Sequence, residues 1–309
     1  MKTTPSPIAI GARHIAPLFG VNDRLAVSRQ TEAVRAVRTQ LTLLLAATAV
    51  SAVSGLAGWD DGAWIAAGVY ALALLFSVRI SRRRARVHYQ AHREVAESVK
   101  SLSWMYMAGG GDFQVGGDTN PDVLFAVRLD ERLRELVKVG WDAERCGEQP
   151  AGAGQITPTM REVRCKPFPV RRDFYLRDRL EEQLAWYGGK SETARHSAAL
   201  WNIVITLLTA GALGMTVLRA WRLHDTDLTG LFSAAAAAAV AWNETRRHRP
   251  LTYAHHLIEQ DLGELREAML RIIPGEGERT EKQWAQMVAA SERLVLPQHT
   301  DWLARFGGK

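Results

Sequence analysis

Four stretches of the chain carry no charged residue, although Asp, Glu, Lys and Arg make up 23% of the sequence. They cover residues 39–59, 62–78, 197–218 and 228–243. A membrane-spanning helix needs roughly 20 mostly apolar residues, and about 17 to 25 are tolerated. The first and third stretches are long enough, the second just reaches the lower limit, and the fourth is short. The pattern therefore predicts two helical hairpins, each made of two apolar helices.

Buried hairpins in a soluble helical bundle would also be apolar. Helices in soluble cores, however, keep a polar face, and these four stretches lack one. Basic residues flank both hairpins, and tryptophans stand near the ends of the stretches, as they do at membrane interfaces. These tryptophans are Trp59, Trp64, Trp201, Trp221 and Trp242. We therefore predict an all-α membrane protein with four spanning helices and long amphipathic cytosolic helices.

The flanking charges also predict the orientation of the hairpins. The first turn contains Asp60 and Asp61 and no basic residue, whereas both outer flanks of this hairpin are rich in arginine. By the positive-inside rule, the turn is external and the flanks are cytoplasmic. The second turn contains Arg219 and Arg222 and indicates its side less clearly. We predict a multi-pass protein of the inner (plasma) membrane with both termini in the cytoplasm.

The surroundings of the two hairpins are similar. Asp-Arg-Leu precedes each hairpin, at residues 23–25 and 178–180, and a basic cluster and an amphipathic helix follow each. This similarity predicts a duplicated helix–hairpin–helix unit. The glycine-rich stretch near residue 150 predicts a boundary. The expected organisation is a tail at 1–22, a first unit at 23–145, a linker at 146–156 and a second unit at 157–309.

Residues 186–193 read WYGGKSET and resemble the end of a phosphate-binding loop. Such a loop has the form G-x-x-x-x-G-K-[ST] and lies between a strand and a helix. Leu184 stands where the first glycine would be, and the preceding residues have helical spacing. We therefore expect a helical segment here and no nucleotide binding.

Other chemistry has little support in the sequence. His255, His256 and Glu259 could share a helical face, but a zinc site needs three or four converging ligands, and a solvated helix near the membrane explains them as well. Acidic pairs such as Asp60–Asp61 have no apolar context that would raise a pKa. The net charge of +6 suits nucleic acid or anionic lipid, and the position of the basic cluster directly after a spanning stretch favours lipid. We expect no catalytic residue, no cofactor, no metal and no nucleic-acid partner.

Small and weakly polar residues within the apolar stretches bear on assembly. Small side chains at 47, 51, 55 and 58 and the alanines at 234–239 let helices approach closely, within one chain or between subunits. Asn202, Thr206 and Thr209 recur at helical spacing on one face. This face would either line a wet path or hydrogen-bond to a neighbouring helix.

The segment before the second hairpin resembles the SLATT family of bacterial two-transmembrane effector domains, which are associated with nucleotide-synthesising and nucleotide-sensing conflict systems. The resemblance covers roughly residues 25–306 as two tandem copies, of which the second is clearer. The stretch at 103–113 and the pair Glu292 and Trp302 are also similar to the family. The motif residues of the second copy are Arg172, Tyr175, Leu176, Arg179, Gln183, Trp186, Tyr187 and Lys190.

The resemblance implies a membrane-embedded effector that forms pores or perturbs the membrane after a trigger from a cytosolic sensor protein or a nucleotide second messenger. The expected partners are the lipid bilayer and further copies of the chain. A non-conducting membrane scaffold and a soluble helical enzyme are the alternatives. At helical spacing, Tyr175, Arg179, Gln183 and Trp186 would form one stripe that either packs against another helix or transmits a signal to the hairpins.

Overall fold

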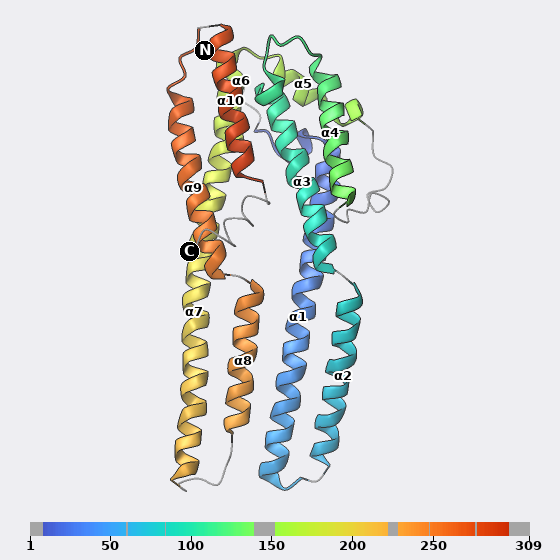
Figure 1. Ribbon diagram of the computed structural model, residues 1–309, viewed down its shortest axis with the longest axis vertical. Coiled ribbons are helices and arrows are strands. Elements are labelled where there is room, and N and C mark those ends of the chain that lie inside the picture. Colours follow the sequence, from blue (N-terminus) through green and yellow to red (C-terminus); the bar gives the residue numbers. More distant parts are fainter. Residues whose placement is uncertain are drawn as a thin grey trace, which may run out of the picture. The chain divides into compact units, whose positions relative to one another are not determined.

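The computed structural model describes residues 9–59, 61–83, 85–138, 152–221, 228–246, 248–275 and 277–296. Every regular element in these ranges is helical, which confirms the predicted all-α class (Figure 1). The predicted linker lies only partly inside the described ranges, and Asp60 and Trp302 lie outside them.

The order of the helices repeats once along the chain. The first series is α1 (Pro17–Ala57), α2 (Gly62–Arg83), α3 (Ala85–Ala108) and α4 (Pro121–Lys138). After the short helix α5 (Pro158–Arg164), the second series is α6 (Phe168–Tyr175), α7 (Glu181–Ala220), α8 (Thr229–Arg246), α9 (His248–Leu270) and α10 (Glu278–Leu294). A π-helical turn, η5 (Leu176–Leu180), joins α6 to α7. The repeated order agrees with a duplicated plan.

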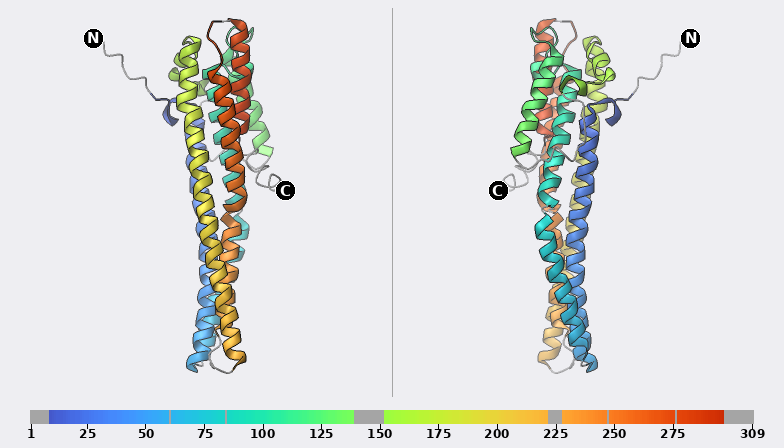
Figure 2. Two further views of the ribbon diagram at one scale, coloured as in Figure 1. Left: turned by 90° about the vertical axis from the view of Figure 1, so that its left-hand side faces the viewer. Right: turned by 90° about the vertical axis from the view of Figure 1, so that its right-hand side faces the viewer.

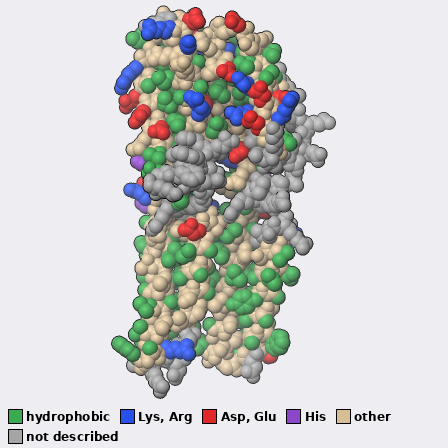
Figure 3. Space-filling view, in the orientation of Figure 1, with side chains coloured by type: hydrophobic (Ala, Val, Ile, Leu, Met, Phe, Trp, Pro, Cys, Tyr) green, Lys and Arg blue, Asp and Glu red, His purple; other side chains and the backbone are tan. Residues whose placement is uncertain are grey.

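The described chain forms two compact units. We call Met1–Ser28, Val87–Ser191 and Pro250–Lys309 the core unit, and Arg29–Arg86 with Glu192–Arg249 the hairpin unit. Charged side chains gather over the helices of the core unit, whereas hydrophobic and uncharged atoms dominate over those of the hairpin unit (Figure 3). The buried hydrophobic core belongs to the core unit and contains large aromatic side chains, among them Trp104, Tyr106, Phe125, Tyr175 and Trp284.

The hairpin unit is held by close contacts within each helical pair. In the first pair, the Thr48 and Tyr70 hydroxyl oxygens lie 3.1 Å apart. In the second pair, a Cβ atom at Gly211 would lie 2.8 Å from the ring of Phe232, so the glycine lets α7 and α8 approach. The rings of Trp201 and Trp242 lie 6.4 Å apart at the other end of this pair.

Three helices within the described ranges are long and apolar enough to cross a membrane. They are Pro17–Ala57, Gly62–Arg79 and the continuous helix Phe168–Ala220, which includes α7. Their large apolar side chains face outward; Leu207, for example, is 66% exposed. Such a surface is stable in lipid and costly in water. The helix α8 is not among the three, so the fourth span stays a prediction.

Two of the apolar helices extend from one unit into the other. Residues 17–28 of α1 belong to the core unit and its later residues to the hairpin unit. Residues 181–191 of α7 belong to the core unit and its residues from 192 onward to the hairpin unit. Both are single helices without a break (Figure 2). The covalent path from the buried core to the apolar segments is therefore helical in both series.

Candidate functional site

The family motif begins at the end of α6 and in the π-helical turn η5. Pro167 precedes α6, and a proline in its first turn starts the helix without the loss of a hydrogen bond. A π-helical turn contains one residue more than an α-helical turn, and such turns are frequent at functional sites. In this protein η5 directs both Arg179 and Leu180 into the core, where each is 1% exposed.

Arg179 forms a fully buried ion pair with Glu292 of α10. Its Nε donates to Oε1 of Glu292 at 2.9 Å, and one of its terminal nitrogens donates to Oε2 at 2.7 Å. The side chains are only 1% and 2% exposed. Two parallel bonds match the planar guanidinium to the planar carboxylate, which is the strong geometry for such a pair. The other terminal nitrogen, Nη1, has no hydrogen-bond partner among the described residues.

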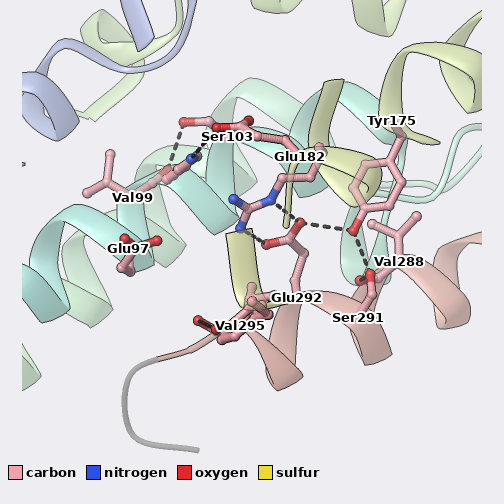
Figure 4. Close-up of polar contacts among 12 residues, drawn as sticks. Glu97, Val99, Ser103, Tyr175, Glu182, Val288, Ser291, Glu292 and Val295 are labelled. Carbon is pink, nitrogen blue, oxygen red and sulfur yellow. Dashed lines mark hydrogen bonds and ion pairs between the residues drawn. The ribbon is translucent and has the colours of Figure 1, made fainter. Parts of the chain in front are cut away.

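Tyr175 completes the contacts of the Glu292 carboxylate. Its hydroxyl donates to Oε1 of Glu292 at 2.9 Å and lies 2.5 Å from the hydroxyl oxygen of Ser291 (Figure 4). The Tyr175 ring packs edge-on against Trp104 and Trp284. The carboxylate thus joins the motif on α6 and η5 to the C-terminal end of α10.

The buried groups shift one another's protonation. Burial disfavours the charged form of Arg179, but the charge and hydrogen bonds of Glu292 outweigh it, and the pKa of the guanidinium rises. Burial and the Glu292 charge raise the pKa of the Tyr175 hydroxyl well above its usual value. Burial and the nearby Arg179 lower the pKa of Lys100, whose ammonium lies 3.9 Å from the Glu182 carboxylate. The raised pKa keeps the Arg179 guanidinium charged beside the Glu292 carboxylate.

A second group of buried contacts closes the end of α3. Arg171 donates to the Ala108 carbonyl at 2.7 Å and pairs with Glu281, and the Trp284 indole nitrogen donates to the same carbonyl at 2.8 Å. These donors satisfy backbone acceptors that a helix end leaves free. Gly110, the second of the three glycines that follow, makes room for α10, because a Cβ atom there would lie 2.3 Å from a methyl carbon of Val288.

The later motif residues lie on a different face from the one predicted. Tyr187 is buried and Leu184 packs against the core, whereas Gln183 is half-buried and Trp186 is 40% exposed. The extra residue in η5 shifts the buried face by one position, so the four residues do not form one stripe. Trp186 and Tyr187 contact His255 of α9, each with ring centroids 5.6 Å from the imidazole. Lys190 lies over the Trp186 ring at 5.7 Å.

The remaining motif residues, Leu176 and Arg172, lie outside the buried ion-pair cluster, as do the three residues of the predicted polar face. Leu176 is buried in the core, and Arg172 reaches the Ile272 carbonyl at 3.4 Å. In the hairpin unit, the hydroxyls of Thr206 and Thr209 donate to carbonyls of their own helix, those of Asn202 and Ile205, at 2.8 Å. Bonding of this kind satisfies the hydroxyl without a neighbouring helix.

The stretch 186–193 lies inside α7, and both its glycines are helical. A phosphate-binding loop would need an irregular loop at this place, so the expected helix is confirmed. His256 lies 3.7 Å from Glu259, and the described residues hold no group of three or more potential metal ligands.

Several residues of the cluster did not stand out in the sequence. Glu281, Trp284 and Lys100 were missed, and Glu292 was noted only for its distance from Trp302. A signal did exist in α10, where Trp284, Val288 and Ser291 form an apolar or small face at helical spacing and Glu292 stands directly beside it. A carboxylate beside a buried face indicates a buried cationic partner.

Comparison with family models decides the affiliation of the chain. The model of SMODS and SLOG-associating 2TM effector domain 3 matches residues 16–172, which is about half of the chain. The model of SMODS and SLOG-associating 2TM effector domain 1 matches residues 175–302. The chain belongs to the SLATT family. It contains two tandem SLATT domains, as the motifs predicted, and is a membrane protein with effector domains of bacterial conflict systems.

Neither the curated proteins nor the solved structures include a significant match to the chain. Within the chain, the two SLATT domains contribute to one hydrophobic core. Ala108 of the first match and Trp284 of the second are joined by a hydrogen bond in this core. The tandem domains therefore share one buried core.

Proposed function

We propose that this protein is an effector that perturbs the bacterial inner membrane when a partner signals infection. The observation that carries the proposal is the continuity of α1 and α7, each of which joins the buried core to an apolar segment. A change among the buried contacts of the core unit has a helical path to the hairpins. A scaffold that only recruits a partner does not need this connection.

The trigger is a separate protein or a nucleotide second messenger. The family description associates these domains with SMODS and SLOG partners, and this favours an external signal. The arginine-rich flanks of the hairpins support a core unit on the cytoplasmic side. A sensor in the cytosol would then contact the core unit directly.

The conducting form is an assembly of several copies. One hairpin offers only a weakly polar face, and the hydroxyls of Thr206 and Thr209 are already bonded to their own helix. Several such faces would have to gather around a shared axis to solvate an ion. Small residues such as Gly55, where an added Cβ meets no atom within 4 Å of the single chain, leave surface for close packing between helices.

Ion flux separates an effector from a scaffold. The purified protein is placed in liposomes that enclose a fluorescent ion reporter, and the membrane potential and growth of cells are measured with and without the partner proteins. We expect flux and depolarisation only in the triggered state, together with a particle larger than one chain in detergent. A monomeric particle, or an unperturbed membrane after triggering, would support the scaffold and refute the effector function.

A further inference from the structure

The π-helical turn η5 stands between the buried ion pair and the apolar part of α7. Turns of this type are rare and occur mostly as single turns within α-helices, so we expect tertiary contacts to hold them in place. One such contact is the Arg179–Glu292 pair, whose arginine lies inside the turn. No other break follows before Ala220, because α7 is one helix from Glu181 onward.

Two adjacent aromatic residues stand where the observed turn and a regular α-helix would each place a buried side chain. In a regular α-helix with 3.6 residues per turn, the residue about three turns after Tyr175 and on the same face is Trp186. With the additional residue of η5, the same place is taken by Tyr187, which is 3% exposed, while Trp186 is 40% exposed. Gln183 and Leu184 are related in the same way, one turn earlier. Leu184 packs against the core in the structure, and Gln183 would take its place in a regular α-helix. Each register thus has an aromatic residue ready for the same position in the core.

We propose that η5 is a register switch, in which the Arg179–Glu292 pair holds the register that buries Tyr187. Loss of the pair lets η5 become α-helical, and Trp186 replaces Tyr187 in the core. The following helix then turns by about 100°, which is the rotation of one residue in an α-helix. The apolar segment of α7 turns with it, because α7 has no break. As a mechanism of membrane perturbation the switch rests on the proposed function, but the rotation itself is measurable without it.

Disulfide cross-linking between α7 and α8 measures the rotation. A Cβ atom at Gly211 would lie 2.8 Å from the Phe232 ring, so cysteines at 211 and 232 report the register of the structure. After the switch, the preceding residue occupies that place, so cysteines at Ala210 and Phe232 report the rotated state. Both pairs are made in a chain with Cys146 and Cys165 changed to serine, and they are oxidised in native membranes.

The decisive variant is Glu292→Gln, which keeps the shape of the side chain and removes its charge. We expect the cross-link to move from the 211–232 pair to the 210–232 pair. Ser291→Ala is the matched control, since it removes a partner of Tyr175 and leaves the ion pair; its cross-link should stay at 211–232. Deletion of the exposed Arg177 removes the additional residue of η5, so in the Glu292→Gln chain this deletion should return the cross-link to 211–232.

A second pair of variants leaves the ion pair intact and covers the case in which Glu292→Gln does not fold. Tyr187→Ala removes the aromatic residue of the present register and should favour the 210–232 cross-link. Trp186→Ala removes that of the alternative register and should keep the 211–232 cross-link. An unchanged 211–232 cross-link in both Glu292→Gln and Tyr187→Ala would overturn the switch.

Ion flux measured on the same variants separates this inference from the proposed function. A shifted cross-link in liposomes without flux would support the switch and refute the effector function as proposed. Flux after triggering with an unshifted cross-link would support the effector function and refute the switch.

Discussion

At the scale of single residues, Glu292 decides the state of the buried cluster. Its two carboxylate oxygens receive three hydrogen bonds, two from Arg179 and one from Tyr175. A buried charge without its partner is far more costly than a buried pair, because the desolvation of the remaining charge is no longer offset. The stability of the core unit should therefore depend on the two charges together.

Glu292→Ala should lower the free energy of unfolding by about 3–5 kcal/mol, because it leaves the Arg179 charge buried and unpaired. Ser291→Ala, which removes one hydroxyl, should cost about 1 kcal/mol. Denaturant unfolding in detergent measures both. The double change Arg179→Met with Glu292→Leu removes both charges and should cost less than Glu292→Ala alone; a larger cost would contradict the argument.

His255 should make stability depend on pH. Burial, together with the nearby Lys190, lowers the pKa of His255 to about 4 in the folded protein, against about 6.5 in an unfolded chain. Between pH 4 and 6.5 the unfolded chain therefore binds more protons at His255 than the folded protein does. The contribution of His255 to the free energy of unfolding is complete above pH 6.5 and is lost as the pH falls toward 4. The full shift corresponds to about 3 kcal/mol, and solvent screening of the partly buried imidazole reduces the expected loss to about 2 kcal/mol. Thermal unfolding between pH 4 and 7 tests this. In His255→Phe, the decrease in melting temperature that the titration of His255 causes should be absent.

At the scale of elements, α7 combines a predictable helix with an unpredictable turn. The sequence indicated a helix through residues 186–193 despite the two glycines, because charged and apolar residues alternate at helical spacing upstream. It did not indicate η5, since a π-helical turn has no composition of its own and depends on contacts with α10. The predicted stripe from Tyr175 to Trp186 assumed a regular helix, and it ends where the turn adds a residue.

Substitutions in this stretch test the helical interpretation. Gly189 is helical and a Cβ atom there would meet no neighbour, so Gly189→Ala should stabilise the protein by up to about 1 kcal/mol. Lys190→Ala should leave ATP binding at background, as in the unchanged chain. Calorimetric titration with ATP and denaturant unfolding measure the two effects. ATP affinity that disappears with either substitution would show that a phosphate site had been overlooked.

At the scale of the whole molecule, the two SLATT domains complete one another. The buried end of α3 belongs to the first matched segment, and the indole of Trp284, which donates to it, belongs to the second. Residues 1–150 and 151–309, expressed as separate chains, should each fail to give a folded protein. Expressed together, they should copurify and unfold in one transition. Two halves that each unfold cooperatively by themselves would refute the shared core.

Cysteine labelling tests the predicted topology. A membrane-impermeant reagent added outside the cell should modify a cysteine at position 61, next to the acidic turn, and should not modify cysteines at positions 84 and 247. Cells opened with detergent give the labelling maximum for each site. The reverse pattern would place the core unit outside the cytoplasm and exclude a cytosolic trigger.

The sequence by itself determined the class of the molecule and the motif. Uncharged stretches between basic flanks indicate membrane helices wherever they occur, because lipid excludes charge irrespective of how the helices pack. The tandem motifs likewise identified the family. Only the tertiary structure decided that Arg179 pairs with Glu292 and that Arg171 and Trp284 close the end of α3. These contacts join residues more than 60 positions apart in the chain, and a local pattern carries no information about which distant side chain becomes the partner of a buried charge.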